Sequence, residues 1–195
     1  MNWLAHLFLS QPNGAHRLGN ILGDLVKGKE RKELHPCFNA GIKSHLLIDS
    51  FTDNHLVVKR SKRRIDREHR RYSGVLVDVF YDHFLAKNWR CYSQVSLADF
   101  TEEVYRSFAK YWDFVPVFSR MVISRMREQK WLLSYSSVDG VEATLKRIKA
   151  KLSAKHKKLF LVDRFLEELE INYLDLERDF NEFFPEIIAY LTSNK

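Results

Sequence analysis

The sequence predicts an all-α protein that folds as a single-domain helical bundle over residues 1–195. From Val162 to Leu191, apolar residues recur at helical spacing over many turns. The chain contains only 7 glycines and 4 prolines, which leaves few turn signals for a β-sandwich or barrel. Its 45% hydrophobic residues are enough for a sizeable core, so a disordered protein is excluded.

Shorter segments with helical spacing precede this last pattern. Helices are expected at 2–10, 15–27, 37–52, 55–70, 72–89, 97–113, 115–135 and 139–153. The valine-rich part of 72–89 is also compatible with a strand, and we interpret it as a helix. Because proline lacks a backbone N–H, Pro185 is expected to kink or restart the last helix. No repeat or Gly/Ser linker divides the chain, which predicts one domain.

The charge balance favours an anionic partner. Lys and Arg number 32 against 25 Asp and Glu, a formal net charge of +7. Basic residues cluster at 59–71 and 146–158, whereas acidic residues concentrate at 163–186. Nucleic acid is not the expected partner, because we find no nucleic-acid-binding motif and no interleaved aromatic residues. An acidic protein or a phosphorylated substrate remains.

The two cysteines give information on the cellular compartment. Cys37 and Cys91 are far apart and form no C-x-x-C pattern, so neither a disulfide framework nor a cysteine metal site is indicated. No segment has the pattern of a signal peptide or of a membrane span. These features predict a cytoplasmic protein without a membrane partner.

The first candidate cluster is His45, Asp49 and Asp53, spaced four residues apart within an apolar segment. On a helix this spacing places the imidazole and both carboxylates on one face. Such a polar stripe in apolar surroundings is expected to have a partner. Alternatively, His45 and Asp49 hydrogen-bond each other while Asp53 caps the next helix.

The second candidate cluster is Asp78, Asp82 and His83, again flanked by apolar residues. Burying unpaired carboxylates is costly, so both aspartates are expected to contact a cation. That cation is either an arginine from the basic run at 59–71 or a metal ion. Two such clusters in one small domain favour a metal, because oxygen and imidazole ligands suit divalent ions.

Residues 3–26 add two polar side chains in apolar surroundings, His6 and Asp24. A lone histidine is usually a satisfied core residue and a lone aspartate is usually a cap, but both increase the number of potential ligands. The segment also approaches a phosphate-binding loop, which we reject because Glu30 replaces the Ser or Thr that binds Mg²⁺. Gly19 and Gly23 are instead expected to permit close helix packing or a bend.

Four motifs in register carry a family resemblance. They are Met-Asn-Trp-Leu-Ala-His-Leu at 1–7, Gly-Asn-Ile-Leu-Gly-Asp-Leu-Val-Lys-Gly at 19–28, Ala-Gly-Ile-Lys-Ser-His-Leu-Leu-Ile-Asp-Ser-Phe-Thr-Asp-Asn at 40–54, and Asp-Val-Phe-Tyr-Asp-His-Phe-Leu-Ala at 78–86. With them the chain resembles the acyl carrier protein phosphodiesterase family. The resemblance implies an all-helical relative of HD-domain phosphohydrolases that splits holo-acyl carrier protein into apo-protein and 4′-phosphopantetheine.

The resemblance also implies a divalent metal, Mn²⁺ first, with Mg²⁺ or Fe²⁺ as alternatives. Its motif positions nominate as metal ligands His6, Asp24, His45, Asp82 and His83. They nominate as catalytic acid or base Asp49, Asp53 and Asp78. The chain contains no His-Asp dipeptide and offers Asp82-His83 in the opposite order, so a non-standard ligand arrangement is expected.

A metal-activated water is expected to attack the phosphorus, and the serine oxygen of the carrier protein would leave. Carrier proteins are small and strongly acidic, so a basic enzyme has an electrostatic reason to capture one. The residues expected to dock the carrier are Arg60, Arg63, Arg64 and Arg67. Two alternatives stay open: an HD-type phosphohydrolase acting on a nucleotide or another small phosphate ester, and a basic helical nucleic-acid-binding protein. The oligomeric state is not predicted.

Overall fold

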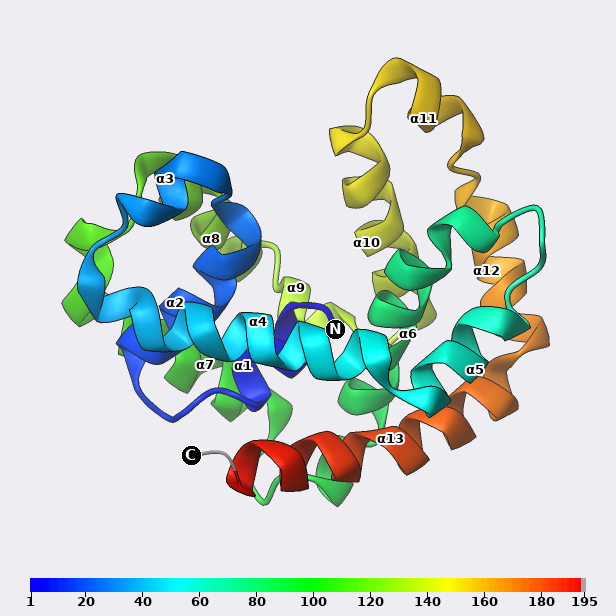
Figure 1. The fold of residues 1–195 in the computed structure, drawn as a ribbon, viewed down its shortest axis with the longest axis horizontal. Helices are drawn as coiled ribbons and strands as arrows, with labels where there is room; N and C mark the ends of the chain where they lie inside the picture. Colours follow the sequence, from blue (N-terminus) through cyan, green and yellow to red (C-terminus); the bar gives the residue numbers. More distant parts are fainter. Residues whose placement is uncertain (194–195) are drawn as a thin grey trace.

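The computed structural model describes residues 1–193, which fold into helices without a strand (Figure 1). The first six helices are α1 (Trp3–Phe8), α2 (Gly14–Leu25), α3 (Gly28–Lys32), α4 (Asn39–Asn54), α5 (Leu56–Arg64) and α6 (Ser73–Lys87). They are followed by α7 (Leu97–Phe108), α8 (Val117–Glu128), α9 (Trp131–Ser134), α10 (Val138–Lys151), α11 (Ala154–Leu159), α12 (Val162–Ile171) and α13 (Tyr173–Ser193). The all-α prediction is confirmed. Within 1–193, none of the helices combines the length and apolar composition that crossing a membrane requires.

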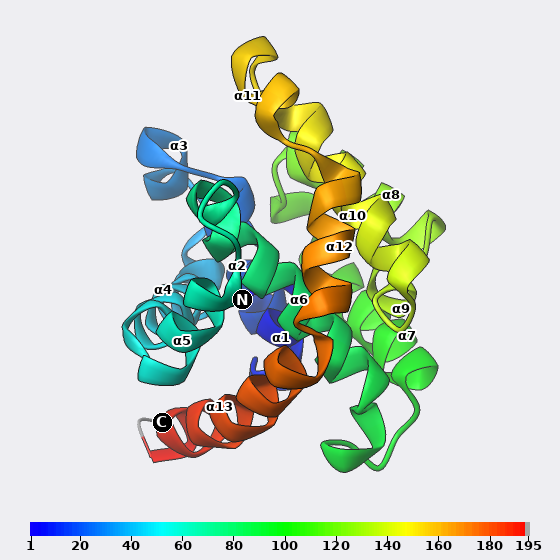
Figure 2. The same cartoon turned by 90° about the vertical axis from the view of Figure 1, so that its right-hand side faces the viewer.

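Helix α6 is the central element. It packs against α1, α5, α10 and α13, and Figure 2 shows it in the interior of the molecule. Tyr81 and Phe84 are fully buried and contact Phe180 of α13. A helix covered on several sides is apolar around much of its circumference, so its periodicity is weak. This explains why the valine-rich segment was also compatible with a strand.

The break in the C-terminal helical pattern lies at Asn172 and not at Pro185. The Asn172 backbone N–H and side-chain amide both donate to the Glu168 carbonyl, which ends α12. Helix α13 then begins at Tyr173 and continues through Pro185. The prediction that Pro185 restarts the helix was therefore wrong. A side-chain amide that competes for a helical carbonyl is the stronger stop signal here.

Two other predicted helices were too long. The segment 55–70 stops being helical at Arg64, because Ile65 has an extended backbone and is fully buried. The segment 115–135 divides into α8 and α9 at Lys130, whose φ of 51° is left-handed. The break at Ile65 accompanies the burial of its side chain, whereas the break at Lys130 is a local left-handed turn among exposed residues. Neither break is visible in local periodicity.

Helices α2 and α4 approach so closely that glycine is required on both. A Cβ on Gly41 would lie 2.1 Å from the His16 carbonyl oxygen, and one on Gly19 would lie 2.3 Å from the Phe38 carbonyl oxygen. The expectation that Gly19 permits close helix packing is confirmed. The close approach matters for the site because α2 carries Asp24 and α4 carries His45.

We predict that Gly41→Ala destabilises the protein by about 1 to 3 kcal/mol, because the added methyl group must push the two helices apart. Gly74→Ala is the matched control, since the nearest atom to its Cβ is the flexible end of Lys62 at 4.0 Å. Replacing glycine by alanine inside a helix without a clash stabilises it by about 0.5 to 1 kcal/mol. Urea unfolding of the two variants measures both effects. Equal stabilities would contradict the close-packing argument.

A buried ion-pair cluster joins α5 to α13. The Asp179 carboxylate is fully buried and accepts hydrogen bonds from Arg60 Nε at 2.8 Å, Arg64 Nε at 2.8 Å and Ser61 Oγ at 2.7 Å. Burial alone would raise the pKa of the Asp179 carboxyl, but the hydrogen bonds from Arg64, Ser61 and Arg60 lower it below its usual value. The acidic C-terminal segment thus neutralises part of the basic run at 59–71.

Asp179→Ala is expected to cost about 3 kcal/mol of unfolding free energy, the lower end of the range for breaking a buried pair, since both guanidiniums are partly exposed. Because the folded-state pKa of Asp179 is lowered, its stabilisation is complete above the unfolded pKa of about 4. It is lost as the pH falls through the folded pKa. Glu167→Gln, which removes an exposed pair with Arg164, is the control and should change stability by less than about 1 kcal/mol. A wild-type-to-variant difference that persists unchanged at pH 2 would refute the assignment.

Candidate active site

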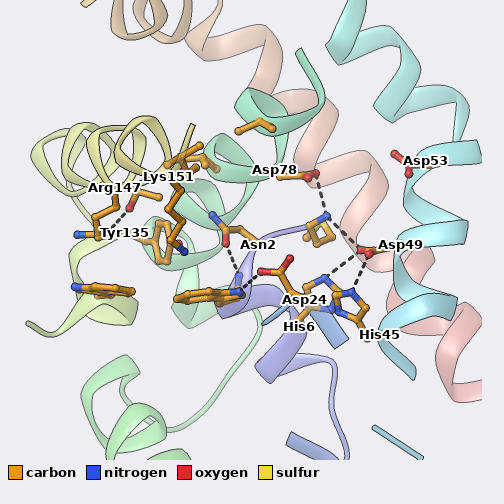
Figure 3. A pocket seen from close by; sticks show the side chains of 17 residues that line it. Asn2, His6, Asp24, His45, Asp49, Asp53, Asp78, Tyr135, Arg147 and Lys151 are labelled. Atoms are coloured by element: carbon orange, nitrogen blue, oxygen red, sulfur yellow. Dashed lines mark hydrogen bonds and ion pairs between the residues drawn. The ribbon is translucent and has the colours of Figure 1, made fainter. Parts of the chain in front are cut away.

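A cavity of about 320 Å³ lies where the N-terminal segment meets α2, α4, α6, α9 and α10 (Figure 3). One end of it is lined by histidine and aspartate side chains from α1, α2, α4 and α6. The other end is lined by tryptophans and by basic residues of α10. Figure 3 shows these two groups on opposite sides of Asn2. The cavity therefore joins residues that are up to about three quarters of the chain apart in sequence.

Three ligand-type side chains converge at the acidic end. Asp49 Oδ1 lies 3.2 Å from His6 Nε2, and Asp49 Oδ2 lies 3.1 Å from His45 Nε2. One ligand atom from each of the three lies within 4.8 Å of the others. The two imidazole rings stack with their centroids 4.5 Å apart. The spacing of His45 and Asp49 correctly predicted that they share one helix face.

The hydrogen bonds of His6 fix which of its nitrogens carries a proton. Asn20 Nδ2 donates to Ser10 Oγ at 2.8 Å, so the amide oxygen of Asn20 faces His6 Nδ1, also at 2.8 Å. Nδ1 must then donate, which leaves a lone pair on Nε2. Buried Nε2 has no hydrogen-bond partner in the described part of the chain, and its lone pair lies opposite the Asp49 carboxylate. Two electron-rich atoms in this arrangement fit a cation between them.

The surroundings of His6 and Asp49 determine their protonation states. Burial lowers the pKa of the His6 imidazole more than the Asp49 carboxylate raises it. Burial would raise the pKa of Asp49, but the hydrogen bond from His45 holds it well below its usual range. A neutral imidazole and an ionised carboxylate are the forms that coordinate divalent ions.

Two packing features place the histidines. The ring of His45 lies against Gly23 of α2, where an added Cβ would be 2.6 Å from His45 Cγ. Helix α1, which carries His6, is fixed at its N-terminus by the buried Asp82 carboxylate. Asp82 accepts the backbone N–H groups of Leu4 at 2.7 Å and Ala5 at 3.2 Å. Gly23 thus admits the His45 ring, as the expected close packing requires.

Three further aspartates line the same cavity. Asp24 accepts a hydrogen bond from Trp3 Nε1 at 2.9 Å. Asp78 lies 2.9 Å from the α-ammonium group of Met1, which is also 3.9 Å from Asp49. Asp53 is mostly exposed and pairs with Lys62 at 2.7 Å. Asp24 and Asp78 therefore lie at the acidic end of the cavity in Figure 3, and Asp53 lies at its margin.

Asp82 and His83, both predicted as metal ligands, do not line the cavity. Asp82 is fully buried below α1, and burial raises its pKa to about 7. His83 projects elsewhere, with Nδ1 2.7 Å from the Tyr135 carbonyl oxygen and Nε2 2.9 Å from the Tyr173 hydroxyl. The structure does not bring these two residues together with His6 and His45. Their apolar surroundings in the sequence reflect burial in the core.

The predicted docking arginines divide into two pairs. Arg60 and Arg64 are engaged with carboxylates of α13, so their charges are already compensated. Arg63 and Arg67 are exposed on the surface. Only the second pair is free to meet a partner, because the acidic segment at 163–186 folds back onto the basic run.

The basic end of the cavity was not predicted. Trp3 and Trp131 stack there with their ring centroids 5.7 Å apart, beside Arg147 and Lys151. Arg147 and Lys151 are four residues apart, a spacing that places both on one face of α10. That spacing was visible in the sequence within the basic run at 146–158. It could not be distinguished from a solvated helix face without knowing what packs against α10.

Comparisons with known proteins agree with the motifs. A family model described as acyl carrier protein phosphodiesterase matches residues 1–187. Proteins named acyl carrier protein phosphodiesterase are 30% identical in Serratia proteamaculans, covering 96% of each chain, and 31% identical in Shigella boydii, covering 97% of this chain and 96% of the relative. A relative with the same name in Yersinia enterocolitica is 28% identical over 97% of this chain and 96% of its own. No solved structure matches. The chain belongs to the acyl carrier protein phosphodiesterase family.

Proposed function

We propose that this protein hydrolyses the phosphodiester bond that joins 4′-phosphopantetheine to a serine of acyl carrier protein. The observation that carries this proposal is the cluster of His6, His45 and Asp49 at one end of a cavity that also contains cationic groups. The family membership and the net charge of +7 support an acidic protein substrate. Two free cysteines, Cys37 and Cys91, suit a reducing cytoplasm.

The proposed cofactor is a divalent metal ion, with Mn²⁺ as the first choice. His6 Nε2, His45 Nε2 and Asp49 would hold it, because the lone pair of His6 and the Asp49 carboxylate face each other without a proton between them. Mn²⁺ and Fe²⁺ are better suited to nitrogen and oxygen donors than to sulfur donors. When bound, such an ion lowers the pKa of a water molecule and neutralises charge on phosphoryl oxygens.

The remaining residues at this end supply proton transfer and positioning. Asp78 is partly exposed and lines the cavity, so its carboxylate can accept the proton of the attacking water. Asp53 at the margin is placed to pass a proton to solvent. Asp24 is oriented by Trp3 and completes the negative side of the cavity. We assign Asp49 to metal binding rather than to acid–base chemistry, because both its oxygens face imidazole nitrogens.

The ligand set predicts which variants lose metal binding. Asp49→Asn removes a charged ligand and should weaken Mn²⁺ binding by more than the roughly 10-fold to 100-fold caused by losing a residue that only orients a ligand. Titration calorimetry with Mn²⁺ measures the change. His83→Gln is the comparison, and it should leave the Mn²⁺ affinity within about 3-fold of wild type. An equal loss in both variants would return His83 to the ligand set.

The activity is tested by intact-protein mass spectrometry of purified holo-acyl carrier protein incubated with this protein and Mn²⁺. The carrier should lose the mass of 4′-phosphopantetheine. EDTA and His45→Ala should each abolish the reaction, and circular dichroism should show that the variant is folded. An unchanged carrier under these conditions would contradict the proposed function, and a panel of nucleotides would then be tested. Arg63 and Arg67 remain the docking residues that we propose for the carrier.

A further inference from the structure

Arg147 is a cation in the cavity without a carboxylate partner. Its side chain is half-buried, and its guanidinium carbon lies 4.4 Å from the centroid of the Trp131 ring. Nη2 donates to Thr144 Oγ1 at 2.6 Å, and residues 1–193 place no carboxylate within ion-pair distance. A guanidinium offers five N–H donors, so most of them are available. Partly burying a charge without compensation is costly unless a ligand supplies the counter-charge.

Lys151 lies one helical turn further along α10, and its side chain is exposed. Its ammonium group is 5.5 Å from the centroid of the Trp3 ring, and it forms no ion pair within 1–193. In contrast, Lys146 of the same helix is 62% exposed, lies outside the cavity and pairs with Glu142 at 2.7 Å. On α10, Lys146 of the outer face therefore has a carboxylate partner, whereas Arg147 and Lys151 of the face toward the cavity have none within 1–193.

The stacked tryptophans connect the two ends of the cavity. Trp131 carries Arg147 on its face, Trp3 stacks on Trp131, and Trp3 Nε1 binds Asp24 at the acidic end. Figure 3 shows Arg147 and Lys151 on one side of the cavity and His6, His45 and Asp49 on the other. The indole face of Trp131 stabilises the guanidinium of Arg147 by a cation–π contact, and the N–H groups that do not bond Thr144 can donate to an oxyanion.

We propose that Arg147 and Lys151 form an anion-binding subsite that takes the phosphate group of the released 4′-phosphopantetheine, at the end of the cavity away from His6, His45 and Asp49. The identity of that product rests on the proposed function, but the chemistry of the subsite does not. Four aspartates line the cavity and repel a phosphate ester, so cations are needed to admit one. Arg147 supplies directed hydrogen bonds and Lys151 supplies a more mobile charge. The tryptophan faces supply an apolar wall for the chain attached to the phosphate.

The test measures binding by metal-free protein in EDTA, with 4′-phosphopantetheine and pantetheine as the two probes. Wild type should bind the phosphorylated probe about 10-fold to 100-fold more tightly, the value of one or two charge-assisted hydrogen bonds. Arg147→Gln should bring the two dissociation constants close together by weakening only the phosphorylated probe. Arg147→Lys should retain part of the preference, and added salt should reduce it in wild type.

The matched control is Lys146→Gln, which removes one positive charge from the outer face of the same helix and should leave the preference unchanged. Thermal melts identify any variant that fails to fold, in which case Lys151→Gln replaces Arg147→Gln. The proposal is overturned if wild type binds both probes equally, or if Arg147→Gln and Lys146→Gln show the same preference between the probes. If wild type turns over the carrier but Arg147→Gln keeps the wild-type preference for the phosphorylated probe, the subsite is refuted and the proposed function stands. If Arg147→Gln loses that preference but wild type does not turn over the carrier, only the proposed function is refuted.

Discussion

The interaction on which the site depends is that of the Asp82 carboxylate with the first turn of α1. A short helix of six residues would not hold its place by itself, because isolated helices of this length are unstable in water. Asp82 is a buried residue of α6. Its carboxylate accepts hydrogen bonds from two backbone N–H groups in the first turn of α1 that have no partner within that helix. Helix α1 brings His6 to the acidic end of the cavity and Trp3 to its aromatic end, so both ends depend on one buried carboxylate.

This role explains what the sequence could predict and what it could not. Spacing within one helix is local, so His45 and Asp49 were correctly placed on one face of α4. Asp82 and His83 are also local neighbours, but successive residues on a helix point about 100° apart. Because α6 is covered on several sides, the sequence alone could not tell which direction faces the cavity. The partner of Asp82 is 78 residues away, and only the packing of α1 reveals it.

The charged runs were likewise visible in the sequence, whereas their contact partners were not. The basic run at 59–71 and the acidic run at 163–186 were both evident, but their mutual neutralisation through Asp179 was not. The long helical pattern itself was visible, although the stop at Asn172 depends on a side-chain hydrogen bond. Once α13 has compensated Arg60 and Arg64, the cations of α10 become the ones that the fold leaves without partners inside the cavity.

A cavity with carboxylates at one end and cations at the other discriminates by charge. Carboxylates alone would repel a phosphodiester, and cations alone would not hold a divalent metal ion. Trp3 touches both ends, since its indole N–H donates to Asp24 while its ring stacks on Trp131 and lies under the ammonium group of Lys151. A change in α1 would therefore move His6 and Trp3 together, so the distance between the two ends is set by the anchoring of α1 on Asp82.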